Sequence, residues 1–242
     1  MKLNLRSYVI IVFLLVLQYP IQGESPVHVG EKLKYEIWYN FVKGGQSWME
    51  ISEIDTIEGR PCFHIVNITR STGVVDLLFS IDDKLESWID PQTHYSYKFQ
   101  KRIREGKYKK DYNVTFNYQD SIAISNSDTT AIMPPIHDAI SIFYYLRKTS
   151  LDTGKFFKVN NFDSDTLKHY NIKVTGQEKI KVPAGEFNCF KLEPFSEEGD
   201  LFEKHENKVE TYLSRDSLRL PVKITSQTKF GQLVMKLKKV EN

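Results

Sequence analysis

The sequence predicts a mainly β protein, an antiparallel spiral β-roll or open barrel-like sheet with one short α-helix over residues 138–148. Three observations lead to this prediction. Apolar and polar residues alternate along most of the chain, turn signals separate these runs, and only one segment has helical periodicity. No repeated strand–helix alternation appears, so a parallel sheet is not expected. The 242 residues, 40% of them hydrophobic, suffice for a core and exclude a disordered chain.

The first residues are predicted to be a signal peptide, residues 1–23. Lys2 and Arg6 precede an uninterrupted apolar run from Val9 to Leu17, and the small residue Gly23 follows. The run is shorter than the roughly 20 residues of a membrane-spanning helix. An uncleaved anchor is the alternative interpretation.

The predicted mature chain is one β-rich domain, residues 24–242, that is periplasmic or secreted and has no stable membrane span after cleavage. No cysteine precedes Cys62, so the protein is not expected to be a lipoprotein. Without the two basic residues of the signal, 31 basic residues balance 31 acidic ones. Binding of nucleic acid through bulk positive charge is therefore excluded.

Period-two alternation and turn residues define the strands. The expected strands cover residues 32–41, 47–51, 62–66, 97–103, 108–114, 170–174, 209–213, 220–224 and 233–237. The expected turns lie at residues 44–45, 58–61, 90–93 and 182–185, where Gly, Pro or Asp favour chain reversal. Residues 125–135 are predicted to be a crossover loop, and residues 196–208 a solvated loop or hairpin tip.

One segment has the pattern of a helix. Asp138 can cap its first turn, and Ala139, Ile142, Phe143 and Leu146 form one apolar stripe. This predicts a helix of about three turns whose stripe packs on the core.

Arg147 follows the stripe, at the helix end where a cation complements the helix dipole. Its guanidinium group either binds a ligand or pairs with an inward carboxylate and pins the helix to the sheet. Arg147 is therefore one candidate ligand-binding residue.

A basic hairpin supplies the other candidates. Its cations surround a single acidic residue, Glu105; they are Lys98, Lys101, Arg102, Arg104, Lys107, Lys109 and Lys110. A two-residue turn at Glu105-Gly106 places Ile103 opposite Tyr108 and keeps the apolar residues on one face.

In that register Lys101 lies opposite Lys110, and Arg102 lies opposite Lys109. Opposed like charges are destabilising. The hairpin tip must therefore stand in water or contact an anionic group. Such a group could belong to an anionic lipid, a glycan or the acidic patch of a partner. Lys101, Arg102, Lys109 and Lys110 are the candidate ligand-binding residues of this site.

Several segments in order resemble a known family. They are residues 30–35 (GEKLKY), 79–83 (FSIDD), 87–91 (SWIDP), 144–147 (YYLR) with Gly154, 182–187 (VPAGEF) and 218–222 (LRLPV). This combination resembles the exported bacterial family called domain of unknown function 3108, over about residues 30–237. The resemblance implies an exported, β-rich, spiral or barrel-like domain of bacterial envelopes, and it supplies no catalytic residues.

The sequence predicts no cofactor, no metal site and no catalytic residue. The six histidines have no metal-binding spacing, and no nucleophile or phosphate-loop motif occurs. Asp82, Asp83 and Asp90 could act as paired carboxylates on glycans. The preferred interpretation is that Asp90 caps a proline turn and that Asp82 and Asp83 lie in a loop. Cys62 and Cys189 could form a disulfide or remain separate buried thiols.

The leading functional hypothesis is a non-enzymatic binding or carrier module for an apolar or anionic envelope ligand. Aromatic residues on the expected inner faces could line a ligand cavity or pack as core; they are Tyr35, Tyr39, Phe41, Tyr97, Phe99, Tyr112 and Phe116. The first alternative is a scaffold or accessory protein that binds other envelope components through sheet edges. The second is a hydrolase acting on glycans.

Overall fold

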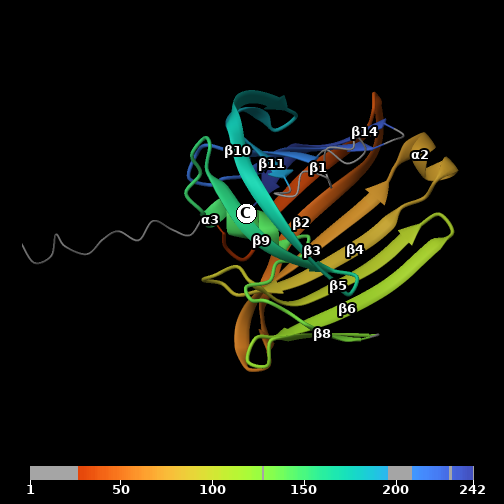
Figure 1. The fold of residues 1–242 in the computed structure, drawn as a ribbon. Coiled ribbons are helices and arrows are strands. Elements are labelled where there is room, and N and C mark those ends of the chain that lie inside the picture. The colour runs from red at the N-terminus through yellow and green to blue at the C-terminus, as the bar shows by residue number, and fades with distance from the viewer. Residues whose placement is uncertain (1–26, 127, 196–208, 229–230, 242) are drawn as a thin grey trace, which may run out of the picture.

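The computed structural model describes residues 27–126, 128–195, 209–228 and 231–241 (Figure 1). The predicted signal peptide and the predicted loop over residues 196–208 lie outside the described residues. The described strands are β1 (Lys32–Tyr39), β2 (Val42–Ile57), β3 (Arg60–Ser71), β4 (Asp82–Ile89), β5 (Ser96–Glu105), β6 (Tyr108–Asn117), β7 (Ile122–Ser125), β8 (Thr129–Ala131), β9 (Phe156–Asp163), β10 (Thr166–Val182), β11 (Gly185–Phe195), β12 (Val209–Ser214), β13 (Pro221–Thr228) and β14 (Gly231–Glu241). The helices are α2 (Gly73–Leu78) and α3 (Ser141–Lys148).

All fourteen described strands belong to one sheet, in the order β8-β7-β6-β5-β4-β3-β2-β1-β14-β13-β12-β11-β10-β9. Each half of the chain is a meander of antiparallel neighbours, and the halves join where β1 pairs with β14. The sheet coils but does not close into a barrel, because β8 and β9 remain as its edges (Figure 1). The predicted mainly β, antiparallel, open barrel-like fold is confirmed.

The segment that crosses between the two halves pairs with part of the β9 edge. The His137 amide donates to the Asn160 carbonyl over 2.8 Å, and the Phe162 amide donates to the His137 carbonyl over 2.9 Å. The neighbouring Ile136 carbonyl accepts from the Ser96 amide over 3.0 Å, at the start of β5. The crossover segment therefore links β9 to β5.

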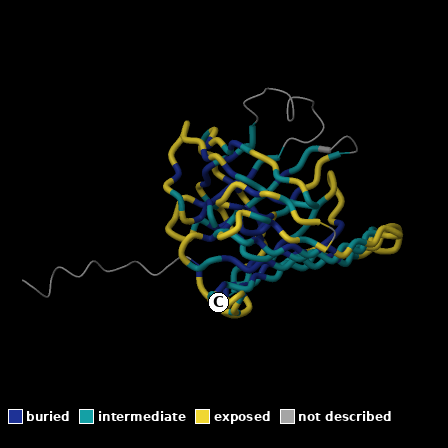
Figure 2. The backbone as a smooth tube through the Cα atoms, turned by 60° about the horizontal axis from the view of Figure 1, so that its bottom comes forward, coloured by how far each residue is buried: buried dark blue, intermediate teal, exposed yellow. Residues whose placement is uncertain are grey.

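Side chains fill the space inside the coiled sheet. Tyr35, Phe99, Phe116, Tyr144 and Phe162 are among its largest fully buried side chains. The rings of Phe116 and Phe162 meet edge to face, with 5.6 Å between centroids, which joins β6 to β9. Figure 2 shows buried residues in the interior of the molecule and exposed residues gathered at the peripheral turns. The large aromatic residues therefore pack as core.

The first predicted turn is wrong by four residues. The chain reverses at Asn40-Phe41, where Asn40 has a φ of 52°, whereas Gly44 and Gly45 lie inside β2. Gly45 is required there by close approach, because a Cβ atom would lie 2.7 Å from the Arg70 carbonyl oxygen. Consequently Tyr39 and Phe41, expected on the inner face, are 39% and 95% exposed.

The predicted register of the basic hairpin is also wrong. Glu105 pairs with Tyr108 and the turn is Gly106-Lys107, so Lys101 lies opposite Tyr112 and Arg102 opposite Asp111. The shift is two residues, which leaves every side chain on its predicted face. Gly106 takes the first turn position with a φ of 56°, as a type II′ hairpin turn requires.

The prediction that residues 125–135 form a loop without a strand is also wrong. Thr129–Ala131 within this segment forms the edge strand β8. β8 has three residues and pairs with β7 alone. A strand this short offers few free backbone groups to another chain.

Candidate functional site

Helix α3 begins at Ser141, three residues later than predicted, and lies between the two hydrophobic clusters of the core. Tyr144 belongs to the larger cluster and Leu146 to the smaller one. The side chains of Tyr144 and Arg147 are buried, whereas Ala139, Ile142 and Phe143 of the predicted stripe are exposed or half-buried. The apolar stripe was predicted to face the core. In the structure most of it borders a groove instead.

The turn before α3 is held by the Asp138 carboxylate. One of its oxygens accepts from the Ile140 and Ser141 amides, over 2.7 and 2.8 Å. The other accepts from the Ser87 and Ser96 hydroxyls, over 2.6 and 2.5 Å. Burial raises the pKa of Asp138, and these four donors stabilise its charged form. The prediction that Asp138 is the N-cap of the helix is wrong, since the N-cap is Ile140; Asp138 holds the preceding turn and fixes it to β4 and β5.

The groove beside α3 has a volume of about 320 Å³ and opens on one side. Its walls come from α3, the turn before α3, and strands β9 to β12. The lining residues are Ala139, Ile142, Phe143, Leu146, Val159, Asn161, Tyr170, Ile172, Leu192, Pro194, Val209 and Thr211.

The chemistry of the groove is almost wholly apolar. Leu146, Val159 and Leu192 are buried and form its floor, at 3%, 2% and 1% exposure. Asn161, Tyr170 and Thr211 supply amide, phenol and hydroxyl groups, and none of the lining residues carries a carboxylate, ammonium or guanidinium group. The groove can accept an uncharged chain or ring.

Arg147 points away from the groove and into the core. Its guanidinium group donates to both oxygens of Glu31, each over 2.6 Å, and its Nε donates to the Leu218 carbonyl over 3.1 Å. The two charged side chains are only 1% and 3% exposed. Pairing with an inward carboxylate, one of the two interpretations of Arg147, is therefore what the structure contains. A ligand-binding role for Arg147 stays a prediction.

Lys101 and Lys110 contact the turn between β9 and β10. Lys101 forms an ion pair with Asp163 and donates to the Ser164 hydroxyl over 2.9 Å. Lys110 donates to the same hydroxyl over 3.2 Å. The hairpin thus contacts an anionic group, as one of its two predicted alternatives requires, and this group is the carboxylate of Asp163 in the same chain.

The other two hairpin candidates lie elsewhere. Arg102 donates to the Asp82 carboxylate over 3.0 Å on the outer face. Lys109 is exposed and lies opposite Arg104. The structure therefore does not gather the four hairpin residues at one place, and ligand binding by them stays a prediction.

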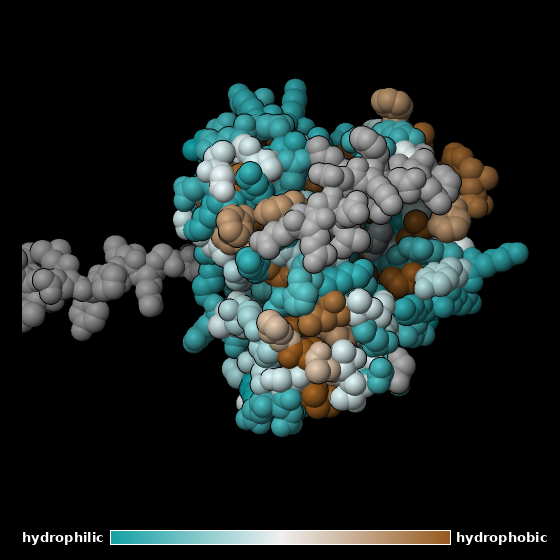
Figure 3. Space-filling model, viewed as in Figure 1, coloured by the Kyte–Doolittle hydropathy of each residue, from teal (hydrophilic) through white to brown (hydrophobic). Residues whose placement is uncertain are grey.

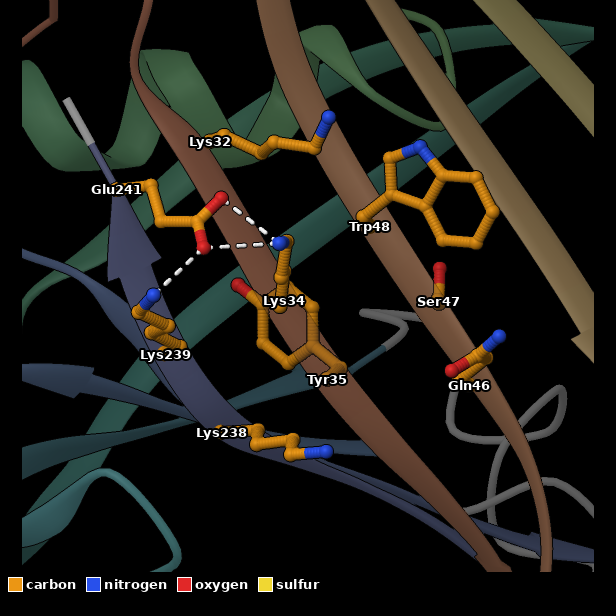
Figure 4. A pocket seen from close by; sticks show the side chains of 9 residues that line it. All are labelled: Lys32, Lys34, Tyr35, Gln46, Ser47, Trp48, Lys238, Lys239 and Glu241. Carbon is orange, nitrogen blue, oxygen red and sulfur yellow. Dashed lines mark hydrogen bonds and ion pairs between the residues drawn. The ribbon is translucent and has the colours of Figure 1, made fainter.

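A second hollow lies over β1, β2 and β14 and has a volume of about 520 Å³ (Figure 4). It is lined by Lys32, Lys34, Tyr35, Gln46, Ser47, Trp48, Lys238, Lys239 and Glu241. Lys239 and Lys34 hold the Glu241 carboxylate between them, both over 2.8 Å, and lower its pKa to about 2. Lys32 pairs with Glu50 over 2.6 Å. Three of these lysine ammonium groups already form ion pairs with carboxylates of the same chain. The hollow is therefore a weaker candidate than the groove for a ligand-binding site.

The acidic candidates for hydrolysis are similarly engaged. Asp82 pairs with Arg70 and Arg102, and Asp83 accepts from the Arg104 amide over 2.7 Å. Asp90 accepts from two amides of its own turn. Within the described ranges, no three His, Cys, Asp or Glu side chains are grouped to hold a metal ion.

The two cysteines are free, buried thiols, one in β3 and one in β11. Burial raises the pKa of Cys62 to about 11 and that of Cys189 to about 12. Such thiols are poor nucleophiles at neutral pH.

An open, coiled antiparallel sheet with one helix at its crossover defines this chain as a barrel-like β protein. The chain belongs to the family described as "Protein of unknown function (DUF3108)", whose model matches residues 34–238. No curated protein matches the sequence. None of the described helices has the length and apolar composition needed to cross a membrane.

The fold is similar to that of a solved structure. The "beta-barrel-like protein" of domain of unknown function DUF1849 from Brucella abortus aligns with a TM-score of 0.60 at 10% identity, over 88% of this chain and 97% of that one. A protein with a YmcC-like fold from Bacteroides fragilis aligns at 10% identity over 90% and 98% of the two chains, with a TM-score of 0.38.

Proposed function

We propose that this protein is a non-catalytic binding module of the bacterial envelope, and that it holds one apolar chain, such as a lipid acyl chain, in the groove beside α3. The observation that carries the proposal is the position of the apolar stripe of α3. A helix normally buries such a stripe in the core, but here Ile142 and Phe143 border the groove.

The size and chemistry of the groove support this ligand class. Its volume lies at the lower end of the ~300–1,000 Å³ range of ligand sites, which suits a single chain. The lack of charged groups along its walls favours a hydrocarbon over an anion. The signal-like N-terminal sequence supports the placement in the envelope.

The alternatives have less support. Edge pairing with a scaffold partner is disfavoured because β8 is short and His137 of the crossover segment pairs with part of the β9 edge, at Asn160 and Phe162. A glycan hydrolase needs two free carboxylates, and those of Asp82, Asp83 and Asp90 are bonded within the chain.

The test is the binding of a fluorescent fatty acid to wild type and two matched variants. Phe143 lines the groove but belongs to neither core cluster, so Phe143→Asn should leave the fold intact. Phe156→Asn removes a 51% exposed ring outside the groove. Losing the burial of one Phe side chain corresponds to roughly tenfold or more in affinity.

We expect Phe143→Asn to weaken binding at least tenfold and Phe156→Asn to leave it unchanged. Absence of binding to wild type, or equal affinities in all three proteins, would refute the proposal. Circular dichroism of each variant checks that the fold is retained.

A further inference from the structure

We infer that the end of the sheet that carries α2 docks on an anionic lipid surface. This end, called the apolar tip, consists of Phe41, Val42, Val74, Leu77, Leu78 and Phe79. The inference concerns a different part of the molecule from the groove and does not depend on the proposed function. β4 begins at Asp82, next to α2, and its Ser87 near the opposite end contacts Asp138 before α3.

Helix α2 has no buried residue. Val74, Leu77 and Leu78 are 70%, 85% and 82% exposed, and Phe79, which follows them, is 50% exposed. In Figure 3 these residues correspond to the brown patch at the upper right, where Figure 1 labels α2. A cluster of large apolar side chains in water is costly, and such clusters mark binding surfaces.

The β1–β2 turn extends the patch. Phe41 is 95% exposed and Val42 is 56% exposed. The turn is fixed beside α2 because the Thr72 amide donates to the Gly44 carbonyl over 2.9 Å. Gly44 also leaves room for Val75, whose Cγ2 would lie 3.2 Å from an added Cβ. The two apolar segments therefore present one surface.

Polar contacts behind the patch hold the apolar side chains outward. The Ser71 hydroxyl donates to the Asp76 carboxylate over 2.5 Å and accepts from the Ile81 amide over 2.7 Å. Hydrogen bonds from Ser71 and Ser80 lower the pKa of Asp76. The carboxylate of Asp76, the one acidic residue of α2, is thus turned back toward β3. Its charge therefore does not lie on the exposed apolar surface.

The basic hairpin lies directly beside the apolar tip. The Gly106 amide donates to the Ser80 carbonyl over 2.8 Å, and a Cβ on Gly106 would lie 2.9 Å from the Phe79 ring. Lys107 and Lys109, next in the chain, are exposed and have no ion-pair partner among the described residues. Tyr108 between them is 55% exposed.

This combination identifies the occupant. Protruding leucine and phenylalanine side chains enter the acyl region of a bilayer, tyrosine suits its interface, and unpaired lysines attract lipid phosphates. The other cations here, Lys43 and Arg104, already pair with Glu36 and Asp111. Lys107 and Lys109 are therefore the residues expected to contact headgroups.

The experiment is co-sedimentation of the protein with protein-free vesicles of phosphatidylglycerol and phosphatidylethanolamine. The protein is purified from cells without truncation. Leu77→Ser/Leu78→Ser removes the most exposed leucines of α2 and touches no buried contact. Ile54→Ser/Met133→Ser is the matched control, since these residues are 59% and 62% exposed elsewhere. Lys107→Gln/Lys109→Gln tests the charge.

We expect wild type and control to sediment with the vesicles, and the double leucine variant to bind at least tenfold more weakly. The double lysine variant should lose roughly fivefold per lysine and most of its salt dependence. Wild type that stays in solution, which a tip built for a protein partner would give, overturns the inference. Equal sedimentation of wild type and the double leucine variant also overturns it.

The two proposals can fail separately. Leu77→Ser/Leu78→Ser should bind the fluorescent fatty acid as wild type does, and Phe143→Asn should sediment with vesicles as wild type does.

Discussion

At the residue scale, the Arg147–Glu31 ion pair is almost fully buried. Two opposite charges leave water, and each then depends on the other for stabilisation. The pair joins the last turn of α3 to the residue before β1, elements that lie far apart in the sequence. It therefore positions the helix that forms one wall of the groove.

Removing one partner should be more damaging than removing both. We expect Arg147→Met to lower the free energy of unfolding by about 3–5 kcal/mol, because it leaves the Glu31 carboxylate buried and unpaired. The double variant Glu31→Leu/Arg147→Met should recover most of this loss in urea unfolding. An exposed pair serves as control, and Lys179→Met beside Glu186 should cost less than about 1 kcal/mol. A double variant as unstable as the single one would contradict this account.

At the element scale, the strands were predictable because alternation depends only on which face of a strand is buried. The same pattern could not give the register of β5 and β6, since a shift of two residues keeps all faces unchanged. The contact that accompanies the observed register, Lys101 with Asp163, joins residues 62 apart in sequence. No local pattern reports it.

The groove was only half predictable. The stripe of α3 was visible as an apolar pattern, but the pattern does not say whether core or solvent lies against it. Tyr144 and Arg147 took the core side because Glu31 supplies the partner that makes burial of Arg147 possible. The apolar tip gave no signal either, because Val74 to Phe79 has the composition of a buried segment.

The crossover segment should loosen at low pH. Burial, and then the nearby His94, lower the pKa of His137 to about 4. An unfolded histidine titrates near 6.5, so the unfolded chain binds the proton first as the pH falls and stability decreases below about 6.5. The rings of Tyr95 and Tyr145 pack on His137, at 5.5 and 4.5 Å between centroids. Asp138, which holds the turn before α3, directly follows His137 in the sequence.

We expect His137→Phe, which keeps the ring packing, to reduce the loss of unfolding free energy between pH 7 and pH 5 by about 2 kcal/mol. Urea unfolding at the two pH values measures it. His169→Phe, at an exposed position, is the control and should retain the wild-type difference. An unchanged pH dependence in His137→Phe would show that the crossover segment does not respond to this group.

At the scale of the whole molecule, the sheet is continuous through the β1–β14 seam, where the ends of the described chain meet. Lys32 lies opposite Glu241. The sheet therefore has no break at which the chain would divide into two independent halves. The division of residues 24–242 into a single domain stays a prediction.

The seam makes the chain suitable for circular permutation. Joining the two termini by a short linker and opening the chain between Glu58 and Gly59, in the exposed β2–β3 turn, should retain the fold. We expect a thermal midpoint within about 5 °C of wild type by circular dichroism. A permutant opened between Phe190 and Lys191, inside β11, is the control and should not fold. Failure of the first permutant would mean that the β2–β3 turn is required for folding.

The same seam sets a time order for biosynthesis. β1 leaves the ribosome before the other thirteen described strands, whereas its partner β14 is made after all of them. At about 5–20 residues per second, roughly 200 residues of synthesis separate the two strands by about 10–40 s. During that interval one edge of β1 remains open to any extended chain nearby. The nascent protein is therefore most exposed to aggregation before β14 emerges, and a chaperone that covers β1 would protect it most at this stage.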